Sequence, residues 1–315
     1  MATTVTAHDL IRPAAATEAV LRRPTRSLWS DAWRQFRRHR LAMFGVFTFS
    51  LLLVATLVGP LVYRTPADTI DYGSGLLGPS LQHPFGTDDL GRDLLARALL
   101  GGRVSMAVGM VAVLIAITLG TFIGAVAGFF GGRIDNALMR VTDLFLALPA
   151  LPLLLMVTYL FRDPLKKVFG PELGIFLLIV AVIGALNWMP LARLVRASFL
   201  SIKQKEFVEA ARCVGASNRR LMANHILPNT LSSVIVAATV GVGAAIITES
   251  ALSFLGLGFP PDMPTWGRLL YDAQNFLDLA PHWAIFPGLL IFLTVLSINY
   301  IGDGLRDALD PRKTQ

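Results

Sequence analysis

The feature that most constrains this chain is a series of six apolar runs, each long enough to cross a membrane. A helix rises about 1.5 Å per residue, so roughly 20 apolar residues span the ~30 Å of hydrocarbon in a bilayer. The runs lie near residues 42–63, 104–130, 137–160, 173–195, 231–255 and 285–304. Because 54% of the residues are hydrophobic and only 16% are charged, an ordinary soluble protein is excluded. The sequence predicts an all-α polytopic membrane protein with six transmembrane helices.

The basic residues indicate the orientation of these helices. Lys and Arg gather at the ends of the apolar runs, so the net charge of +7 indicates membrane topology and not nucleic-acid binding. With the N-terminus inside, the cytoplasmic side would hold twenty of the 28 basic residues and the outside eight. The positive-inside rule therefore predicts that both termini are cytoplasmic. Residues 1–24 contain no apolar h-region, so we expect no removable signal peptide.

The remaining segments complete the domain organisation. In residues 28–40, Trp29, Trp33 and Phe36 recur at helical spacing among arginines, which predicts an amphipathic helix lying in the cytoplasmic interface. A basic anchor is the simpler interpretation of this helix, and a regulatory element is the alternative. The other predicted parts are a mobile cytoplasmic tail at 1–27, the first transmembrane helix at 42–63, a periplasmic segment at 64–103, a transmembrane core at 104–304 and a cytoplasmic tail at 305–315.

A polar stretch at 201–228 separates two of the apolar runs and has the pattern of two short helices joined at a glycine. Ser201 and Gln204 have capping-box spacing before a helix over 206–214. Gly215 is expected to adopt a positive φ, and Ser217 to cap a second helix that Pro228 ends. In the first helix, the apolar stripe consists of Phe207, Ala210, Ala211 and Val214, and the charged stripe of Glu206, Glu209 and Arg212.

Two interpretations of this loop stay open on physical grounds alone. A folded, two-faced cytoplasmic loop can serve as a contact surface for another protein. It can also be an ordinary solvated loop, with internal Lys205–Glu209 and Glu209–Arg212 pairs worth a few tenths of a kcal/mol each.

Small residues mark the places where helices are expected to pack closely. Gly120, Gly124 and Gly128 follow one another at a spacing of four in the second span. Such a stripe allows two helix backbones to approach each other, either within the chain or against a partner.

Two acidic residues lie in apolar surroundings. A charge in hydrocarbon costs at least ~2.5–3.5 kcal/mol near the bilayer centre, so Glu249 in the outer half of the fifth span is a candidate for the translocation path. The alternative is a hydrogen-bonded structural glutamate. Asp143, nearer the cytoplasmic face, is expected to pair with Arg140 in a structural role.

Two external segments have helical features. In residues 83–103, Asp88 is a candidate N-cap for a short helix. In residues 256–283, several prolines precede Trp266 and an amphipathic stretch, which suits a lid or docking site; Trp266 also fits an interfacial aromatic belt.

No motif for catalysis or for a bound cofactor is present. The chain has no phosphate-binding G-x-x-x-x-G-K-[ST] loop, no H-E-x-x-H helix and no Gly-x-Ser-x-Gly turn, and its five histidines are scattered. Cys213 is the only cysteine, which excludes a disulfide framework and a thiolate metal site. We therefore expect no catalytic, cofactor or metal residues. An ion-coupled secondary transporter, using Glu249 or Asp143, is a less favoured alternative, as is an intramembrane enzyme.

Several stretches resemble the permease subunits of ATP-binding-cassette (ABC) importers. Glu209-Ala210-Ala211, then Gly215 and finally Leu227-Pro228 have the spacing of the EAA loop of that family, although His225 stands where most members have isoleucine. Further stretches are similar to the C-type permease subunit of oligopeptide and dipeptide importers: SLWSDAWRQFRRHR at 27–40, FGTDDLGRDLLARALLGGR at 85–103, GGRIDNALMRVTDLFLALP at 131–149, ESALSFLGLG at 249–258 and NYIGDGLRDALDP at 299–311.

This resemblance implies a type I ABC importer permease fold in a bacterial inner membrane. It implies a related second permease subunit, two ATPases that bind ATP and Mg, an external solute-binding protein and a peptide substrate. An oligopeptide is the expected cargo, with a dipeptide, nickel or glutathione as alternatives. The residues that would contact the ATPase are Glu206, Glu209, Ala210, Ala211, Gly215, Ala216, Ser217, His225, Leu227 and Pro228.

Overall fold

The computed structural model describes residues 28–309, which form helices and no β-strand. The tail predicted at 1–27 lies outside the described residues, as do residues 310–315 of the tail predicted at 305–315. Residues 305–309 of that second tail are the end of a helix. The helices are α2 (Leu28–Arg38), α3 (Arg40–Val62), η1 (Tyr72–Ser74), α4 (Leu94–Phe130), α5 (Gly132–Ala147), α6 (Ala150–Phe169), α7 (Pro171–Lys203), α8 (Glu206–Cys213), α9 (Asn218–Arg220), the π-helical η2 (Leu221–Ile226), α10 (Leu227–Phe254), α11 (Trp266–Ala273) and α12 (His282–Leu309).

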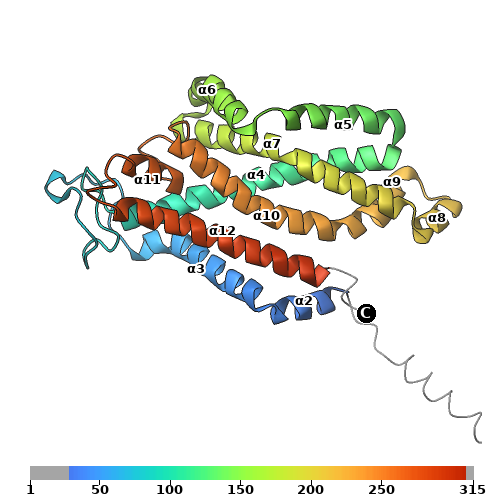
Figure 1. Cartoon of the computed structure of the whole chain (residues 1–315), viewed down its shortest axis with the longest axis horizontal. Coiled ribbons are helices and arrows are strands. Elements are labelled where there is room, and N and C mark those ends of the chain that lie inside the picture. The colour runs from blue at the N-terminus through green and yellow to red at the C-terminus, as the bar shows by residue number, and fades with distance from the viewer. Residues whose placement is uncertain (1–27, 310–315) are drawn as a thin grey trace, which may run out of the picture.

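The long helices run along one axis and form an elongated bundle (Figure 1). The segment 63–93 and α11 lie at one end, here named the α11 end, and α8 and α9 lie at the opposite α8 end. Figure 1 shows α5 and α6 along one margin of the bundle, and α3 with α2 along the other.

Five helices of the described chain are long and apolar enough to cross a membrane, and a sixth span is possible from α5 and α6 together. This agrees with the predicted number, but the third span, predicted as one helix at 137–160, is broken. The axes of α5 and α6 differ by 88°. Leu148 is extended with ψ 138°, because Pro149 disfavours helical geometry in the residue before it and has no N–H to donate.

The second span begins ten residues earlier than predicted, so the end of the supposed external segment 64–103 is helical. Asp93 is the N-cap of α4, and its side chain accepts a hydrogen bond from the backbone N–H of Ala96 at 2.8 Å. The predicted cap at Asp88 is wrong. Its carboxylate accepts from the N–H groups of Leu90 and Arg92, at 3.0 and 2.8 Å, within the preceding turn.

The tightest helix pair is α4 with α7, and the glycine stripe lies in it. A Cβ atom on Gly124 would be 2.4 Å from the carbonyl oxygen of Ala192, and one on Gly128 would be 2.6 Å from the Cβ of Phe199. Gly120 likewise lies against the carbonyl oxygen of Trp188. The backbones can approach this closely only because these three residues lack side chains.

The largest buried apolar cluster joins α4, α7 and α10. Its α7 members Ile175, Ile179 and Ile183 are buried against Val108 of α4 and Leu252 of α10. By contrast α3 buries only four of its 23 residues and exposes large apolar side chains. The core is thus built on α4, α7 and α10, with α3 outside it.

Helix α5 is joined to α7 mainly by charges. Asp143 pairs with Arg193 of α7 and not with Arg140 as predicted, and Arg140 is exposed. The guanidinium of Arg196 donates two hydrogen bonds to Asp135, at 2.5 and 2.6 Å. The structural role expected for Asp143 therefore takes the form of a contact between helices.

Candidate functional site

The polar loop at the α8 end folds into two parts joined at Gly215, as the sequence predicts. Gly215 has φ +89°. Its N–H donates to the carbonyl of Arg212, and the N–H of Ala216 donates to that of Ala211, both at 3.0 Å. This is the Schellman arrangement that ends a helix with a left-handed residue, and it requires a residue that tolerates positive φ.

The start of the loop differs from the prediction. Helix α7 continues through Ser201 to Lys203, and Gln204 is its C-cap, so the proposed capping box is not formed. Lys205 precedes α8 and provides no side-chain cap. Phe199 of α7 is fully buried, which keeps the last turns of this helix against the bundle. Because Phe199 is buried, α7 continues through Ser201, where the capping-box spacing predicted the start of a new helix.

One side of the loop is anchored in an apolar cluster. Val208 of α8 and Leu221 and Ile226 of η2 are fully buried, in one cluster with Phe199 of α7 and Phe129 of α4. The ammonium group of Lys203 also donates to the carbonyl of Phe129 at 2.5 Å. Because packed apolar interiors are stiff, these contacts join α8 firmly to α4 and α7.

The other side of α8 faces away from the chain. Phe207 is 46% exposed and Val214 is 90% exposed. The apolar stripe of the sequence analysis is thus largely solvent-facing, and Val208, which lies outside that stripe, makes the buried contact. Within residues 28–309, the ion pairs include neither Lys205–Glu209 nor Glu209–Arg212. The internal pairing expected of an ordinary solvated loop is not observed.

The second part of the loop runs directly into α10, so Pro228 does not end a helix as predicted. Ser217 is at the N-cap position of α9 but makes no side-chain cap bond. The N–H of Leu227 donates to the carbonyl of Met222, five residues back, at the end of the π-helical η2. This wider turn accommodates the proline ring, which would otherwise clash with a carbonyl in the preceding turn. His225 is partly exposed in η2, and its carbonyl accepts from the side chain of Asn229 at 2.6 Å.

Glu249 lies in a closed polar cluster and has no exposed surface. Ser253 and Ser105 donate hydrogen bonds to its carboxylate at 2.8 and 3.1 Å. The hydroxyl of Ser105 in turn accepts from the N–H of Trp266 at 3.2 Å. Trp266 is itself fully buried, and its indole N–H donates to the carbonyl of Ala98 at 3.0 Å, so it does not form an interfacial belt. The cluster joins α4, α10 and α11, and a solute in this conformation would not reach Glu249.

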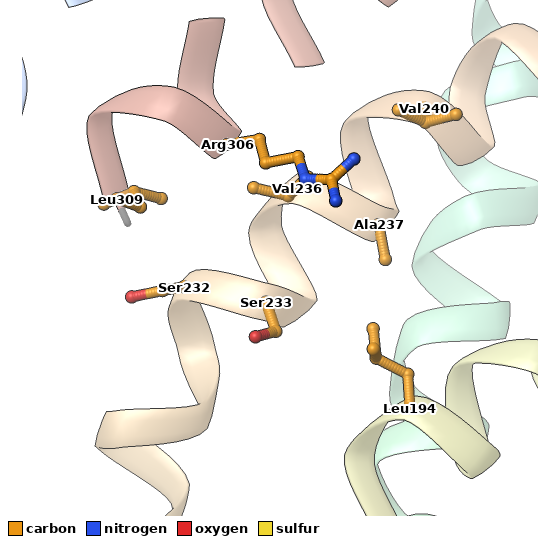
Figure 2. Close-up of a pocket in the computed structure, with 8 residues that line it drawn as sticks. All are labelled: Leu194, Ser232, Ser233, Val236, Ala237, Val240, Arg306 and Leu309. Atoms are coloured by element: carbon orange, nitrogen blue, oxygen red, sulfur yellow. The ribbon is translucent and has the colours of Figure 1, made fainter. Parts of the chain in front are cut away.

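A groove that the sequence analysis missed lies between α7, α10 and α12 (Figure 2). It has a volume of about 550 Å³. The guanidinium of Arg306 extends across it, and the hydroxyls of Ser232 and Ser233 lie on α10 (Figure 2). Arg306 has no ion pair within residues 28–309. Sequence spacing gave no signal for this groove, because its residues come from three helices that are far apart in the sequence.

No arrangement for metal chemistry is evident in the described part of the chain. Residues 28–309 contain no group of three His, Cys, Asp or Glu side chains placed to hold a metal ion. Cys213 is exposed at the end of α8. The strongest candidate site is the exposed side of α8.

Comparison with known families agrees with the fold. Residues 116–315 match the family described as binding-protein-dependent transport system inner membrane component. Residues 27–84 match the N-terminal transmembrane domain of oligopeptide transport permease C.

Individual proteins are similar over nearly the whole chain. The dipeptide transport system permease protein of Alkalihalophilus pseudofirmus is 39% identical over 286 residues, which cover 91% of this chain and 90% of that protein. The glutathione transport system permease protein of Escherichia coli is 41% identical over 288 residues and covers 91% of each chain. Among solved structures, a methionine ABC transporter in inward-facing conformations matches with a TM-score of 0.53 and 20% identity, over 67% of this chain and 94% of that one. The last comparison supports the fold alone.

Proposed function

This chain belongs to the family of binding-protein-dependent transport system inner membrane components and is a multi-pass permease subunit of an ABC importer, and on that premise we propose that ATPase subunits drive it through α8 to import oligopeptides. ATP and Mg would be bound by two separate ATPases. A related second permease would complete the pathway, and an external solute-binding protein would deliver the cargo. Glutathione, dipeptides and nickel are the alternative cargoes. One of the relatives above is named for dipeptide transport and the other for glutathione transport, and glutathione is itself a short peptide.

The observation that carries the proposal is the two-sided character of α8. Its exposed side offers Phe207 and Val214 among charged residues that have no ion pair within residues 28–309. This combination of apolar centre and polar rim suits a protein interface. Its buried side, through Val208, is packed against the same cluster as α4 and α7. A partner that moves α8 would therefore move the transmembrane core.

The energetic requirement for coupling is that ATP favours one of two permease conformations. A ligand shifts such an equilibrium only by the difference between its affinities for the two states. ATP bound in closed ATPases would meet this requirement if the closed pair fits only one position of the loop 206–228. The loop must then move as a unit, which the Schellman turn at Gly215 allows.

Replacing Gly215 with valine tests this mechanism. A β-branched residue at φ +89° costs at least about 1–2 kcal/mol, so the turn should rearrange and shift α8. We expect the assembled transporter to insert and hydrolyse ATP while peptide uptake per ATP falls several-fold. Glu209→Lys should act similarly by reversing a charge on the exposed face. Uptake by reconstituted vesicles, normalised to the inserted protein, measures both effects.

Two variants at the other end of α7 are matched controls. Gly170 has φ +85° and open space around it, so Gly170→Val introduces the same strain far from α8. Glu172→Lys reverses an exposed charge in the first turn of α7. Normal coupling in Gly215→Val and Glu209→Lys, or equal losses in the controls, would reject α8 as the coupling element.

The cargo is tested by competition in the same vesicles. A labelled tri- to pentapeptide should be taken up, and unlabelled oligopeptides should inhibit its uptake more strongly than a dipeptide, glutathione or nickel ions. Stronger inhibition by one of the other three would assign that cargo instead, without affecting the coupling proposal.

A further inference from the structure

One face of α2 carries three arginines that have no partner in the described chain. Residues 30, 33, 34, 37 and 38 lie on one side of the helix because they follow its period. They line a cavity of about 350 Å³ and are Ser30, Trp33, Arg34, Arg37 and Arg38. We name this surface the basic face of α2. Within residues 28–309, its arginines make no ion pair and no side-chain hydrogen bond.

The opposite face of α2 is held against α12, which fixes the direction of the basic face. Phe36 is buried and packs on Gly304, where even a Cβ atom would be 3.0 Å from its ring. The side-chain amide of Gln35 donates to the carbonyl of Asp307 at 2.7 Å. The arginines are therefore presented on an ordered helix and not on a loose tail.

The basic face lies where the apolar outer surface of α3 begins. Helix α2 ends before His39, whose Nδ1 accepts from the N–H of Ala42 at 3.0 Å and so caps α3. Immediately afterwards α3 exposes a stripe of apolar side chains: Leu41, Phe44, Phe47 and Leu51. Because α3 is a membrane span, this stripe contacts acyl chains and α2 lies at the level of the headgroups. Trp33, 60% exposed, is a residue type favoured at that level.

We propose that the basic face of α2 binds the phosphate headgroup of an anionic phospholipid, whose acyl chains lie on the exposed side of α3. Three like charges within two helical turns repel one another, and a phosphate removes that repulsion. Guanidinium groups suit this ligand because they donate paired hydrogen bonds to phosphate oxygens. Free phosphate would meet the same arginines, but it would gain nothing from Leu41 and Phe44.

The test counts lipids that stay bound to the complete transporter. The complex is reconstituted in phosphatidylcholine with a minor fraction of phosphatidylglycerol, released in detergent and examined by native mass spectrometry. The wild type should retain phosphatidylglycerol in preference to phosphatidylcholine. Arg34→Gln/Arg37→Gln/Arg38→Gln should lower this preference by roughly fivefold for each arginine removed, and the triple lysine variant should retain part of it.

Arg133→Gln/Arg140→Gln is the matched control, because it removes exposed charges on α5. It should keep the wild-type preference. Equal phosphatidylglycerol retention in the wild type and the α2 glutamine variant would overturn the proposal, as would an equal loss in the α5 control. Displacement of the lipid by millimolar inorganic phosphate would overturn the assignment to a lipid.

Discussion

At the scale of single residues, Glu249 is held by hydroxyl groups from two helices at the α11 end. Ser253 and Ser105 both donate to its carboxylate, and Ser105 also links it to the backbone of α11. A buried acidic side chain is tolerated when its oxygens are satisfied in this way. The geometry favours the structural interpretation of this residue over contact with the solute.

Substitution at Glu249 separates these roles. Glu249→Gln keeps the shape and most hydrogen bonds, so peptide uptake per inserted transporter should stay within about twofold of the wild type. Glu249→Leu should destabilise the protein by roughly 1–3 kcal/mol, because it leaves buried hydroxyls without a partner. Uptake assays and thermal unfolding in detergent measure the two effects. A large loss of uptake in a stable Glu249→Gln variant would instead place this carboxylate on the solute path.

Single residues also illustrate what local sequence can predict. The positive φ of Gly215 was predictable, because a glycine that ends a short helix and precedes another has few alternatives. Ser201 and Gln204 were misleading, since the burial of Phe199 outweighs a local start signal worth about 1 kcal/mol. Asp88 was also a wrong candidate, because its carboxylate accepts from the N–H groups of Leu90 and Arg92 in the preceding turn. Asp93, five residues later, is the N-cap that α4 uses.

At the scale of elements, α5 is unusual in being attached by charges and bounded by breaks. Gly131, with φ +67°, precedes it, its first residue Gly132 has φ +56°, and Pro149 follows it. Its apolar side chains are mostly exposed, and its two buried residues are Asp135 and Thr142. The position of α5 on α7 therefore depends largely on two Asp–Arg pairs.

Breaking the less exposed of these pairs should release α5 without unfolding the core. A partly exposed ion pair contributes up to about 1 kcal/mol, so Arg196→Gln should speed amide hydrogen exchange in α5 by up to roughly fivefold and leave α7 unchanged. Exchanging the charges, Asp135→Arg with Arg196→Asp, should restore protection. Arg133→Gln, which removes an unpaired exposed charge of α5, is the control. Equal exchange in all of these variants would mean that other contacts hold the helix.

Elements also mark the limit of prediction from periodicity. The apolar runs located the spans. The break between α5 and α6 also had a visible signal, Pro149, but the run 137–160 was interpreted as one continuous helix. The signal for the π-helical turn of η2 was Pro228, which the sequence analysis interpreted as the end of a helix and not as a wider turn within one. For α8, periodicity identified an apolar stripe but not its direction, since an apolar stripe that faces away from the chain has the same spacing as one that faces the core.

At the scale of the whole molecule, the chain has a compact core and several surfaces that need a partner. The core of α4, α7 and α10 is packed as in a soluble protein, whereas α3, α5 and α6 expose large apolar side chains. Acyl chains would cover the exposed side of α3, as proposed above, and lipid or a second permease would cover α5 and α6. Membrane lipid would not cover the exposed apolar side chains of α8, because α8 lies beyond the spans at one end of the bundle (Figure 1).

Cross-linking from Cys213 tests the central proposal, contact between α8 and an ATPase, most directly. This residue is exposed at the end of α8 and is the only cysteine in the chain, so a maleimide–diazirine reagent marks that position without any substitution. Photolysis of the assembled importer should give a product that contains this chain and an ATPase subunit. The product should be absent from the Cys213→Ser variant. Efficient labelling of Cys213 without any cross-link to an ATPase, in a transporter that remains active, would contradict the proposal.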